Sequence, residues 1–588
     1  MQLLDVTDFV EFLGRGESVS GVQRVIAEVA PRLTDIQPVV LDRARGEFIA
    51  LTPTEVTQVH NLNAAGILDR ARTAQPVSIN PDTILVFLGA LWISDALMLA
   101  ARDAHAKGAK LVVLLYDLTP VLDAQHTAAV NRLFERYLSI AGQLASRVPA
   151  ISQSSRNDFT AYCEQHNWEP PQGAATGLPP GITPTTQTIS PWPRPYALFV
   201  GTIEGRKNHM LALQAWQQLD NPPDLVCIGR LGWNANEFLR EYITTNGLNG
   251  KVSVLTSGVT DEQLAAFYEH AEFAIYPSQY EGWGLPVSES LAFGKLPIVA
   301  NNSSLPEAGL DLAVYFDTDN LDSFVTAITT QALDPEQREQ HEARIRAAAL
   351  TNANDTTWDH VAHIIMNEIE AARHSEPRRV MPPLVELGHE YTLGNQSQAP
   401  DAAYADKYLD HLAREGLTPL LHQQPKPDDL LTVDSALIGE FGSPQTWGYE
   451  LRPGKSATFT ITRPTSGDLT VHFATRSMPG KATVSSTGPG GPTHQDLYLG
   501  SVLSFPLGAG SEGESAMVVF HVTDATDSIE GFLGLRSFVV MESADLNAEV
   551  MIQKAAAQAL RQELDYMTNT RSWKVTEPLR KWKGRGSQ

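Results

Sequence analysis

Two glutamates eight positions apart, Glu281 and Glu289, flank a Gly-Trp-Gly-Leu-Pro turn in this sequence. The turn follows residues 273–278, an apolar run that predicts a buried strand ending in turn residues. A helix beginning near Pro286 would direct unpaired backbone N–H groups and the positive end of its dipole at that strand end. Open α/β sheets bind nucleotide phosphates there, and carboxylates at such a place accept hydrogen bonds from sugar hydroxyls. Taken alone, the same residues also fit a structural turn whose glutamates favour helix initiation.

A pair of adjacent cations, Arg206 and Lys207, lies in a second segment of the same type. Residues 196–200 form an apolar run, Gly201 begins a glycine turn, and a helical pattern follows the cations at residues 209–219. Because Arg presents a bidentate fork and Lys a compact charge, two such side chains at a strand end suit a diphosphate. This segment therefore predicts a phosphate-binding turn.

A third strand-to-helix segment follows further along the chain. The short apolar run 297–300 precedes Ser304, and Glu307 comes three residues later, a spacing that predicts a capping box with Ser304 as N-cap. Each segment alone fits an ordinary α/β protein. Their succession within about one domain's length is harder to explain in that way.

Residues 196 to about 320 resemble the C-terminal half of the retaining glycosyltransferases of family four, which have the GT-B fold of two Rossmann-like domains. The matching segments are 200–208, 276–286, Glu289 and 304–307. The resemblance implies that Arg206 and Lys207 serve the donor's diphosphate. It also implies that Glu281 serves the hydroxyls of the transferred sugar and that Glu289 serves the nucleotide ribose.

The resemblance gives two sets of expected site residues. The catalytic set is Glu281, Arg206, Lys207 and Asp117. The donor-binding set is Gly21, Gly201, Ser278, Gly282, Trp283, Gly284, Leu285, Pro286 and Glu289. No metal and no cofactor are implied, because the leaving diphosphate is expected to be stabilised by the two cations and a helix end.

The N-terminal half carries the same pattern more weakly. Similar enzymes have a glycine-bearing loop where this chain has Gly21, and a plain helix start capped by Ser20 is the equal alternative. The apolar run 110–115 predicts a strand buried on both faces and leads into Tyr116 and Asp117. Many relatives have His-Asp at these two positions, which leaves open whether side chain 116 contacts the donor sugar. Asp117 either helps to position the acceptor or catalytic region or is an ordinary strand-end aspartate.

Composition excludes several classes of protein. A chain of 588 residues implies three or four domains, and its net charge of −24 repels nucleic acid. With 2 cysteines and no clustered spacing among its 16 histidines, the sequence predicts no disulfide framework and no metal site. The N-terminus lacks a secretory pattern and no apolar run reaches the roughly 20 residues of a membrane span. We therefore expect a cytoplasmic enzyme whose membrane contact, if any, is peripheral on the inner face of the plasma membrane.

The order of composition and pattern predicts five parts. They are an N-terminal Rossmann-like acceptor domain (1–185), a C-terminal Rossmann-like donor domain (186–375), a linker (376–430), a β-sandwich accessory domain (431–543), and a helix with a basic, tryptophan-containing tail (544–588). In the last part, residues 545–567 carry an apolar stripe able to dock or to form a homo-oligomer. Residues 571–585 place Trp573 and Trp582 among six cations, which suits either an anionic membrane surface or a solvated terminus. This ending also resembles the tail of many bacterial surface-polysaccharide glycosyltransferases.

The sequence thus predicts an α/β protein of two Rossmann-like domains (GT-B), followed by an all-β sandwich-like domain and a C-terminal helix. Its expected activity is retaining transfer of a hexosyl unit, of mannosyl type, from a nucleotide diphosphate sugar. The expected acceptor is a saccharide or lipid-linked saccharide in surface-polysaccharide or O-antigen assembly. The alternative is a catalytically inactive glycosyltransferase-like scaffold or a glycan-binding protein.

Overall fold

The computed structural model describes residues 1–378 except 16–18, 20, 44, 123–127, 185–188, 233, 258, 351–356 and 377, and then residues 387, 390–392, 437–439, 449–451, 456–475, 483–487, 493–496, 502–522 and 533–543. Two units are distinguished, residues 1–93 with 107–378 and residues 94–106 with 379–588. The predicted helix 545–567, the basic segment 571–585 and most of the predicted linker lie outside the described residues.

The first sheet of the first unit has the strand order of a doubly wound Rossmann-like domain. In space it runs β3 (Glu47–Ala50), β2 (Gln37–Asp42), β1 (Gln2–Asp5), β4 (Ile84–Phe87), β5 (Lys110–Val113), β6 (Ala145–Arg147). All neighbours are parallel except β3, which forms an antiparallel pair with β2. Its helices in chain order are α1 (Thr7–Leu13), α2 (Val22–Val29), α3 (Pro53–His60), α4 (Ile67–Ala71), α6 (Thr119–Leu122), α7 (Ala128–Ser139) and α8 (Gln153–Gln165).

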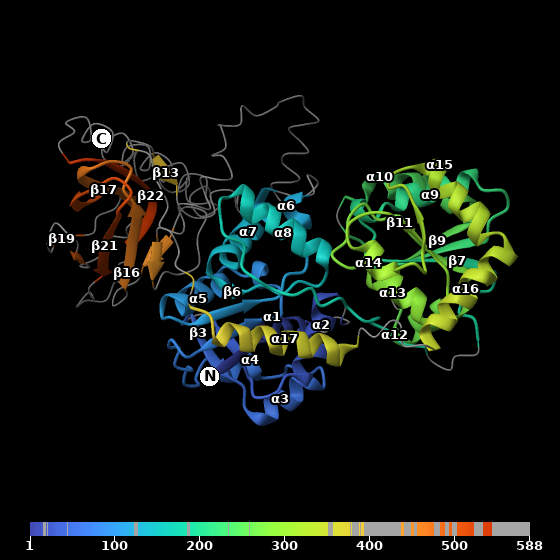
Figure 1. Cartoon of the computed structure of the whole chain (residues 1–588), viewed down its shortest axis with the longest axis horizontal. Helices are drawn as coiled ribbons and strands as arrows, with labels where there is room; N and C mark the ends of the chain where they lie inside the picture. Colours follow the sequence, from blue (N-terminus) through green and yellow to red (C-terminus); the bar gives the residue numbers. More distant parts are fainter. Residues whose placement is uncertain are drawn as a thin grey trace, which may run out of the picture. The chain divides into compact units, whose positions relative to one another are not determined.

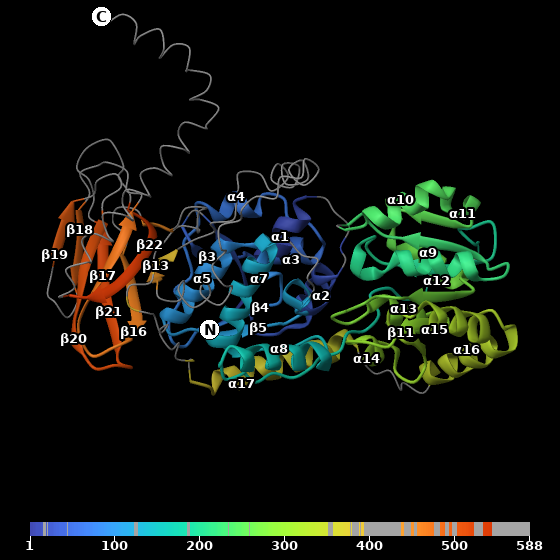
Figure 2. The ribbon, with the colours of Figure 1, turned by 90° about the horizontal axis from the view of Figure 1, so that it is seen from above.

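The second sheet repeats this order with every pair parallel. In space it runs β12 (Val314–Phe316), β11 (Pro297–Ala300), β10 (Phe273–Tyr276), β7 (Tyr196–Val200), β8 (Asp224–Ile228), β9 (Val252–Leu255). Its helices are α9 (His209–Gln218), α10 (Asn236–Thr244), α11 (Asn246–Gly250), α12 (Asp261–His270), α13 (Leu285–Ala292), α14 (Leu305–Gly309), α15 (Leu321–Ala327) and α16 (Pro335–Leu350) (Figures 1 and 2).

Helices cover both faces of the second sheet, which explains why β7, β10, β11 and β12 contain no charged residue and no polar alternation. Along β7, Phe199 joins a core that includes Leu213 of α9, whereas the preceding Leu198 joins another core with Tyr268 of α12. Since successive residues of a strand point to opposite faces, both faces are buried. The strand order reverses between β7 and β10, and the loops that leave these two strands therefore border the crevice where such folds bind ligands.

Helix α17 (Trp358–Arg373) follows the second sheet in sequence but packs on the first (Figures 1 and 2). Its Val361, Ile365 and Ile369 are fully buried in the core that contains residues of β1, β4 and β5. Its Glu368 carboxylate accepts hydrogen bonds from Arg147 (2.6 Å) and from the backbone N–H of Ala174 (2.9 Å). The helix thereby connects the end of the second Rossmann-like domain to the first, and the two are named the donor-side and the acceptor-side domain after their predicted roles.

The second unit contains two antiparallel sheets with a shared core. One sheet joins β13 (Glu390–Thr392), β22 (Leu533–Glu542), β17 (Gly467–Thr475) and β20 (Val502–Gly510), with β15 (Tyr449–Leu451) beside β22. The other joins β14 (Leu437–Gly439), β16 (Ser456–Thr462), β21 (Ser515–Val522), β18 (Thr483–Thr487) and β19 (Thr493–Asp496). Phe459 of the second sheet contacts Phe473 of the first across the core, with ring centroids 5.1 Å apart.

Two observations refine the predicted parts of this unit. Residues Glu390–Thr392 lie within the stretch 376–430 predicted to be a linker, yet they form a strand paired with β22. Helix α5 (Asp95–Ala106), which lies between β4 and β5 in sequence, also belongs to this unit and contacts β14. The predicted fold class is confirmed for the two Rossmann-like domains and the β-sandwich, while its C-terminal helix lies outside the described residues. Within the described part of the chain, no helix is long and apolar enough to cross a membrane.

Candidate functional site

The loops after β7 and β10 bring the two predicted segments together. After β7, residues Gly205–Lys207 form a single 3₁₀ turn that carries Arg206 and Lys207. After β10, the chain passes Ser278 and Glu281 to Gly284, which has φ +104° and starts α13. This left-handed conformation favours glycine, and the predicted helix start near Pro286 is confirmed.

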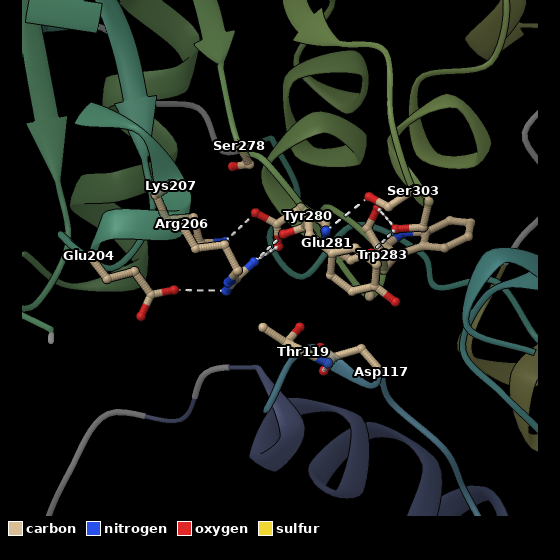
Figure 3. A network of polar contacts seen from close by, with 12 residues as sticks. Asp117, Thr119, Glu204, Arg206, Lys207, Ser278, Tyr280, Glu281, Trp283 and Ser303 are labelled. Atoms are coloured by element: carbon tan, nitrogen blue, oxygen red, sulfur yellow. Dashed lines mark hydrogen bonds and ion pairs between the residues drawn. The ribbon is translucent and has the colours of Figure 1, made fainter. Parts of the chain in front are cut away.

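A buried ionic cluster occupies this crevice (Figure 3). The Glu281 carboxylate is 2.6 Å from Lys207 Nζ through Oε1 and 3.0 Å from Arg206 Nη1 through Oε2. Arg206 Nη2 is 2.7 Å from Glu204 Oε1, and Nη1 also donates to the carbonyl of Tyr280. The four charged side chains are between 9% and 15% exposed, so water screens them weakly. Together they hold two positive and two negative charges.

The cluster fixes the protonation state of its members. Burial alone would raise the pKa of Glu281, but Lys207 and Arg206 outweigh it and lower that pKa to about 2. Burial likewise would lower the pKa of Arg206, whereas Glu281, Glu204 and Asp117 raise it above its ordinary value. Glu281 and Arg206 are therefore both ionised at neutral pH.

The backbone around Glu281 is held by two serines. Its N–H donates to Ser303 Oγ (2.9 Å), and its carbonyl accepts from Ser304 Oγ (2.8 Å), which also reaches the carbonyl of Trp283 (3.0 Å). Ser303 has φ +44°, an uncommon conformation for a residue other than glycine. The loop that carries Glu281 is therefore anchored from both sides.

The predicted capping box at Ser304 and Glu307 is wrong. Ser304 occupies the N-cap position of α14 but has helical dihedrals (φ −83°, ψ −5°), and its hydroxyl makes no cap hydrogen bond. The Glu307 carboxylate instead accepts from the backbone N–H groups of Gln153 and Ser154, each at 2.7 Å. A carboxylate of the donor-side domain thus caps the first turn of α8 in the acceptor-side domain.

Helix α8 and the segment that follows β5 also approach the Glu281 loop. Tyr280 donates to Asp158 Oδ2 at 2.5 Å. A β-carbon at position 282 would lie 2.9 Å from Asp117 Oδ2 and 3.0 Å from the carbonyl oxygen of Tyr116, which is why glycine occurs there. Asp117 is oriented by the backbone N–H of Thr119, which donates to Oδ1 at 2.9 Å, and it faces the ionic cluster in Figure 3.

The side chain of Tyr116 lies in the core of the acceptor-side domain. Its ring belongs to the cluster of buried residues around β1 and β4, and its hydroxyl donates to the carbonyl of Leu88 at 2.7 Å. Burial raises the pKa of this phenol well above its usual value. Tyr116 is therefore a packing residue of this domain.

Glu289 lies in a second buried polar group. Its Oε2 accepts from the Tyr268 hydroxyl at 2.7 Å, and a β-carbon at Gly181 would lie 2.9 Å from its Oε1. The Arg24 side chain of α2 also reaches Gly181, donating to its carbonyl at 3.0 Å and forming an ion pair with Asp261 at 2.6 Å. Arg24 therefore connects the acceptor-side domain, the segment between the domains and α12.

The remaining predicted donor residues have these positions. Gly21 is the N-cap of α2 with φ +54°, and Ser20 lies outside the described residues. Gly201 ends the β7 strand against the aliphatic part of Lys207, and buried Ser278 hydrogen-bonds Glu281. The indole N–H of Trp283 donates to Ser288 at 3.1 Å. Gly282, Gly284, Leu285 and Pro286 form the turn into α13.

Three residues that the sequence did not single out, Glu204, Ser303 and Arg24, hold the predicted ones in place.

Glu289 gives the protein a specific dependence of stability on pH. Burial raises its pKa to about 7, with hydrogen bonds from Tyr268 opposing the rise. The folded pKa lies above the unfolded value of 4.5, so its contribution to stability is complete below pH 4.5 and is lost as the pH rises through 7. Wild type should therefore lose up to about 3 kcal/mol of unfolding free energy through this group between pH 5 and 8.

Urea unfolding of Glu289→Gln across that pH range tests this expectation, because glutamine cannot ionise. Buried Asp5, whose pKa burial also raises to about 7, provides the matched comparison in Asp5→Asn. Each variant should reduce the change in unfolding free energy between pH 5 and 8 by a similar amount. A Glu289→Gln profile parallel to that of wild type would show that Glu289 ionises normally in the folded protein.

Comparisons with known proteins agree with the predicted resemblance. Residues 187–348 match the family model for glycosyl transferases group 1, which confirms the expected family for this part of the chain. The O-antigen chain mannosyltransferase B of Escherichia coli is 33% identical over 168 residues, which is 28% of this chain and 42% of that protein. The serotype-specific mannosyltransferase WbdA of Escherichia coli is 24% identical over 319 residues, 50% of this chain and 38% of that protein. The chain thus spans less than half the length of either relative.

Among solved structures, Anabaena Alr3699/HepE in complex with UDP and glucose is similar with a TM-score of 0.44 and 14% identity. That match covers 63% of this chain and 99% of the other. A sucrose-phosphate synthase from Thermosynechococcus elongatus is similar with a TM-score of 0.44 and 14% identity, covering 62% of this chain and 97% of the other.

Proposed function

Since this chain contains a group 1 glycosyltransferase domain, we propose that it is a retaining hexosyltransferase that uses a nucleotide diphosphate sugar. The transferred unit is of mannosyl type, and the acceptor is a saccharide or lipid-linked saccharide in O-antigen or related surface-polysaccharide assembly. The names of the Escherichia coli relatives support this choice of sugar and setting. The observation that carries the proposal is the buried contact of Arg206 and Lys207 with Glu281 at the point where the strand order reverses.

In the proposed reaction, the bond between the anomeric carbon of the sugar and the diphosphate breaks as the acceptor hydroxyl oxygen bonds to that carbon from the same face, and the hydroxyl proton passes to the leaving diphosphate. Arg206 and Lys207 stabilise the negative charge that grows on the diphosphate, and Glu281 orients the sugar through its hydroxyls. Preorganised charges in a site of low water content contribute most where charge develops, so a covalent nucleophile is unnecessary. Asp117 faces these groups from the acceptor-side domain and positions the acceptor. Glu289 serves the ribose of the nucleotide.

The proposal extends to the cellular setting of the reaction. A cytoplasmic protein that acts on a lipid-linked acceptor needs contact with a membrane surface, and residues 571–585 supply cations and tryptophans suited to anionic headgroups. Residues 545–567 are proposed to associate with a second copy through their apolar stripe.

Thermal unfolding in the presence of a panel of nucleotide sugars tests the proposed activity. A ligand that binds only the folded protein raises the midpoint in a saturable manner, so one donor should do so, with GDP-mannose the first candidate. Lys207→Met keeps the aliphatic part of the side chain and should reduce the shift. The donor that shifts the midpoint should then be hydrolysed slowly without acceptor. A shift without hydrolysis or transfer would favour the inactive scaffold, and no shift with any donor would contradict the proposal.

A further inference from the structure

The two cations assigned to the diphosphate already have carboxylate partners in the folded protein. Glu281 contacts Lys207 at 2.6 Å and Arg206 at 3.0 Å, and Glu204 contacts Arg206 at 2.7 Å. A phosphate oxygen and a carboxylate oxygen use the same ammonium and guanidinium N–H groups. A diphosphate that binds here therefore competes with the two glutamates for the positive charge of these cations.

The surroundings of the two glutamates differ. Glu204 is wedged against the turn after β8, where a β-carbon at Gly232 would lie 3.1 Å from Glu204 Cβ and 3.3 Å from its Oε2. Glu281 lies in a loop whose backbone is anchored by Ser303 and Ser304, while its side chain has the two cations as ion-pair partners. Rotation of the Glu281 side chain thus frees the cations without displacing the loop.

We propose that Glu281 is the resident counter-anion of the diphosphate site and that it helps to expel the nucleoside diphosphate product. This inference rests on the proposed function and adds a second task for Glu281. In the free protein its carboxylate occupies the cations. When the donor binds, the diphosphate takes the cations and the sugar hydroxyls become the new hydrogen-bond donors to Glu281.

The same exchange runs in reverse after transfer. The sugar departs with the acceptor, and Glu281, which is 8% exposed in the free protein, then keeps the Ser278 hydroxyl but is paired with no cation. An unpaired buried carboxylate is costly, so Glu281 is drawn back to Lys207 and Arg206 and competes with the diphosphate for them. The competition arises only after the sugar has left, and therefore it weakens the binding of the product more than that of the intact donor.

Calorimetric titration with nucleoside diphosphates, meaning GDP, UDP, ADP and dTDP, tests this proposal in the full chain. Glu281→Gln keeps the size of the side chain but removes its charge, and it should bind the cognate diphosphate about tenfold or more tighter than wild type. Glu204→Gln is the matched control, because it removes an equal charge from the other side of Arg206. It should change the affinity less than Glu281→Gln does, because Glu204 contacts only Arg206 whereas Glu281 contacts both cations.

The relative affinities for the nucleoside diphosphate and for the nucleotide sugar provide a second test of the proposal. Wild type should bind the nucleotide sugar more tightly than the diphosphate, and Glu281→Gln should reverse that order because it loses the sugar contacts as well. If Glu281→Gln does not fold, Glu281→Asp shortens the side chain by one methylene and should also tighten diphosphate binding. Unchanged or weaker binding in the Glu281 variants, or equal tightening in Glu204→Gln, would overturn the inference while leaving the proposed function in place. If no diphosphate binds wild type or any variant, the proposed function fails as well.

Discussion

Arg206→Ala should lower the rate of sugar transfer by about 10³-fold, the largest effect that we expect from a single substitution. The guanidinium connects Glu204, Glu281 and the carbonyl of Tyr280, and in the proposed reaction it meets the charge that grows on the diphosphate. Lys207→Ala should lower the rate by about 10²-fold, because Arg206 still neutralises part of that charge. Single-turnover kinetics with saturating donor measures both effects.

Arg206→Ala should also cost stability, which the sequence alone did not indicate. The substitution leaves two buried carboxylates without their shared cation, and breaking a buried ion pair in this way costs about 3 kcal/mol. In Lys207→Ala, Glu281 keeps its contact with Arg206 and the loss should be smaller. The free energy of unfolding, obtained by urea titration, separates the two variants.

Arg338→Ala is the matched control for these substitutions. Arg338 forms a partly buried ion pair with Glu272 at 2.5 Å in the same domain but belongs to neither predicted site. Its replacement should reduce stability while the transfer rate stays within about twofold of wild type. A normal rate in Arg206→Ala would remove Arg206 from the catalytic set, and an equal loss of rate in Arg338→Ala would mean that the rate follows stability.

Local sequence patterns predicted the two α/β domains well because their strands have a simple environment. The runs 196–200, 273–276 and 297–300 are apolar without alternation, as strands covered on both faces must be, and each is a strand of the second sheet. The start of α13 was equally predictable, since the Gly-Leu-Pro sequence supplies a left-handed glycine followed by a proline in the first turn. In such places the local preference and the global fold agree.

Contacts between residues distant in sequence determine the features that the sequence did not predict. Ser304 and Glu307 have the spacing of a capping box, but both side chains bind groups distant in sequence, because the carbonyl of Glu281 and the open first turn of α8 compete successfully for them. Helix α17 buries Val361, Ile365 and Ile369, whose spacing marks one face of a helix but does not identify the domain that this face contacts. Periodicity specifies a helix face, whereas only the assembled fold specifies its partner.

In the candidate site, too, the residues were predicted but their contacts with one another were not. The resemblance to family-four glycosyltransferases assigned Arg206, Lys207 and Glu281 to one donor site, and the structure brings them together because β7 and β10 are neighbours in one sheet. Their direct ion pairs, and the part of Glu204 in them, depend on side-chain directions that spacing does not determine. The sequence also assigned Gly282 to a phosphate-binding turn, whereas its immediate constraint is the contact with Asp117 and Tyr116.

Gly282→Ala should therefore lower the rate of sugar transfer more than it lowers the affinity for the donor. The new β-carbon would lie 2.9 Å from Asp117 Oδ2 and 3.0 Å from both Asp117 Cβ and the carbonyl oxygen of Tyr116, closer than unbonded atoms approach. The Glu281 loop and the end of β5 must move apart to admit it. Because a misplacement of about 1 Å between reacting groups can cost 10²-fold, we expect the transfer rate to fall by about that factor.

Donor affinity should fall less than the transfer rate in Gly282→Ala, because Glu281 and its ion-pair partners Arg206 and Lys207 belong to one domain and can shift together. Gly14→Ala is the control: Gly14 ends α1 with φ −62°, and a β-carbon there meets backbone oxygens at 3.3 and 3.5 Å. It should leave both rate and affinity near wild type. A loss of rate that exceeds the loss of donor affinity in Gly282→Ala would mean that the reaction requires Asp117 and Glu281 at their present separation. A normal rate would show instead that the two domains react from a more open arrangement, and that Asp117 takes no part in placing the acceptor.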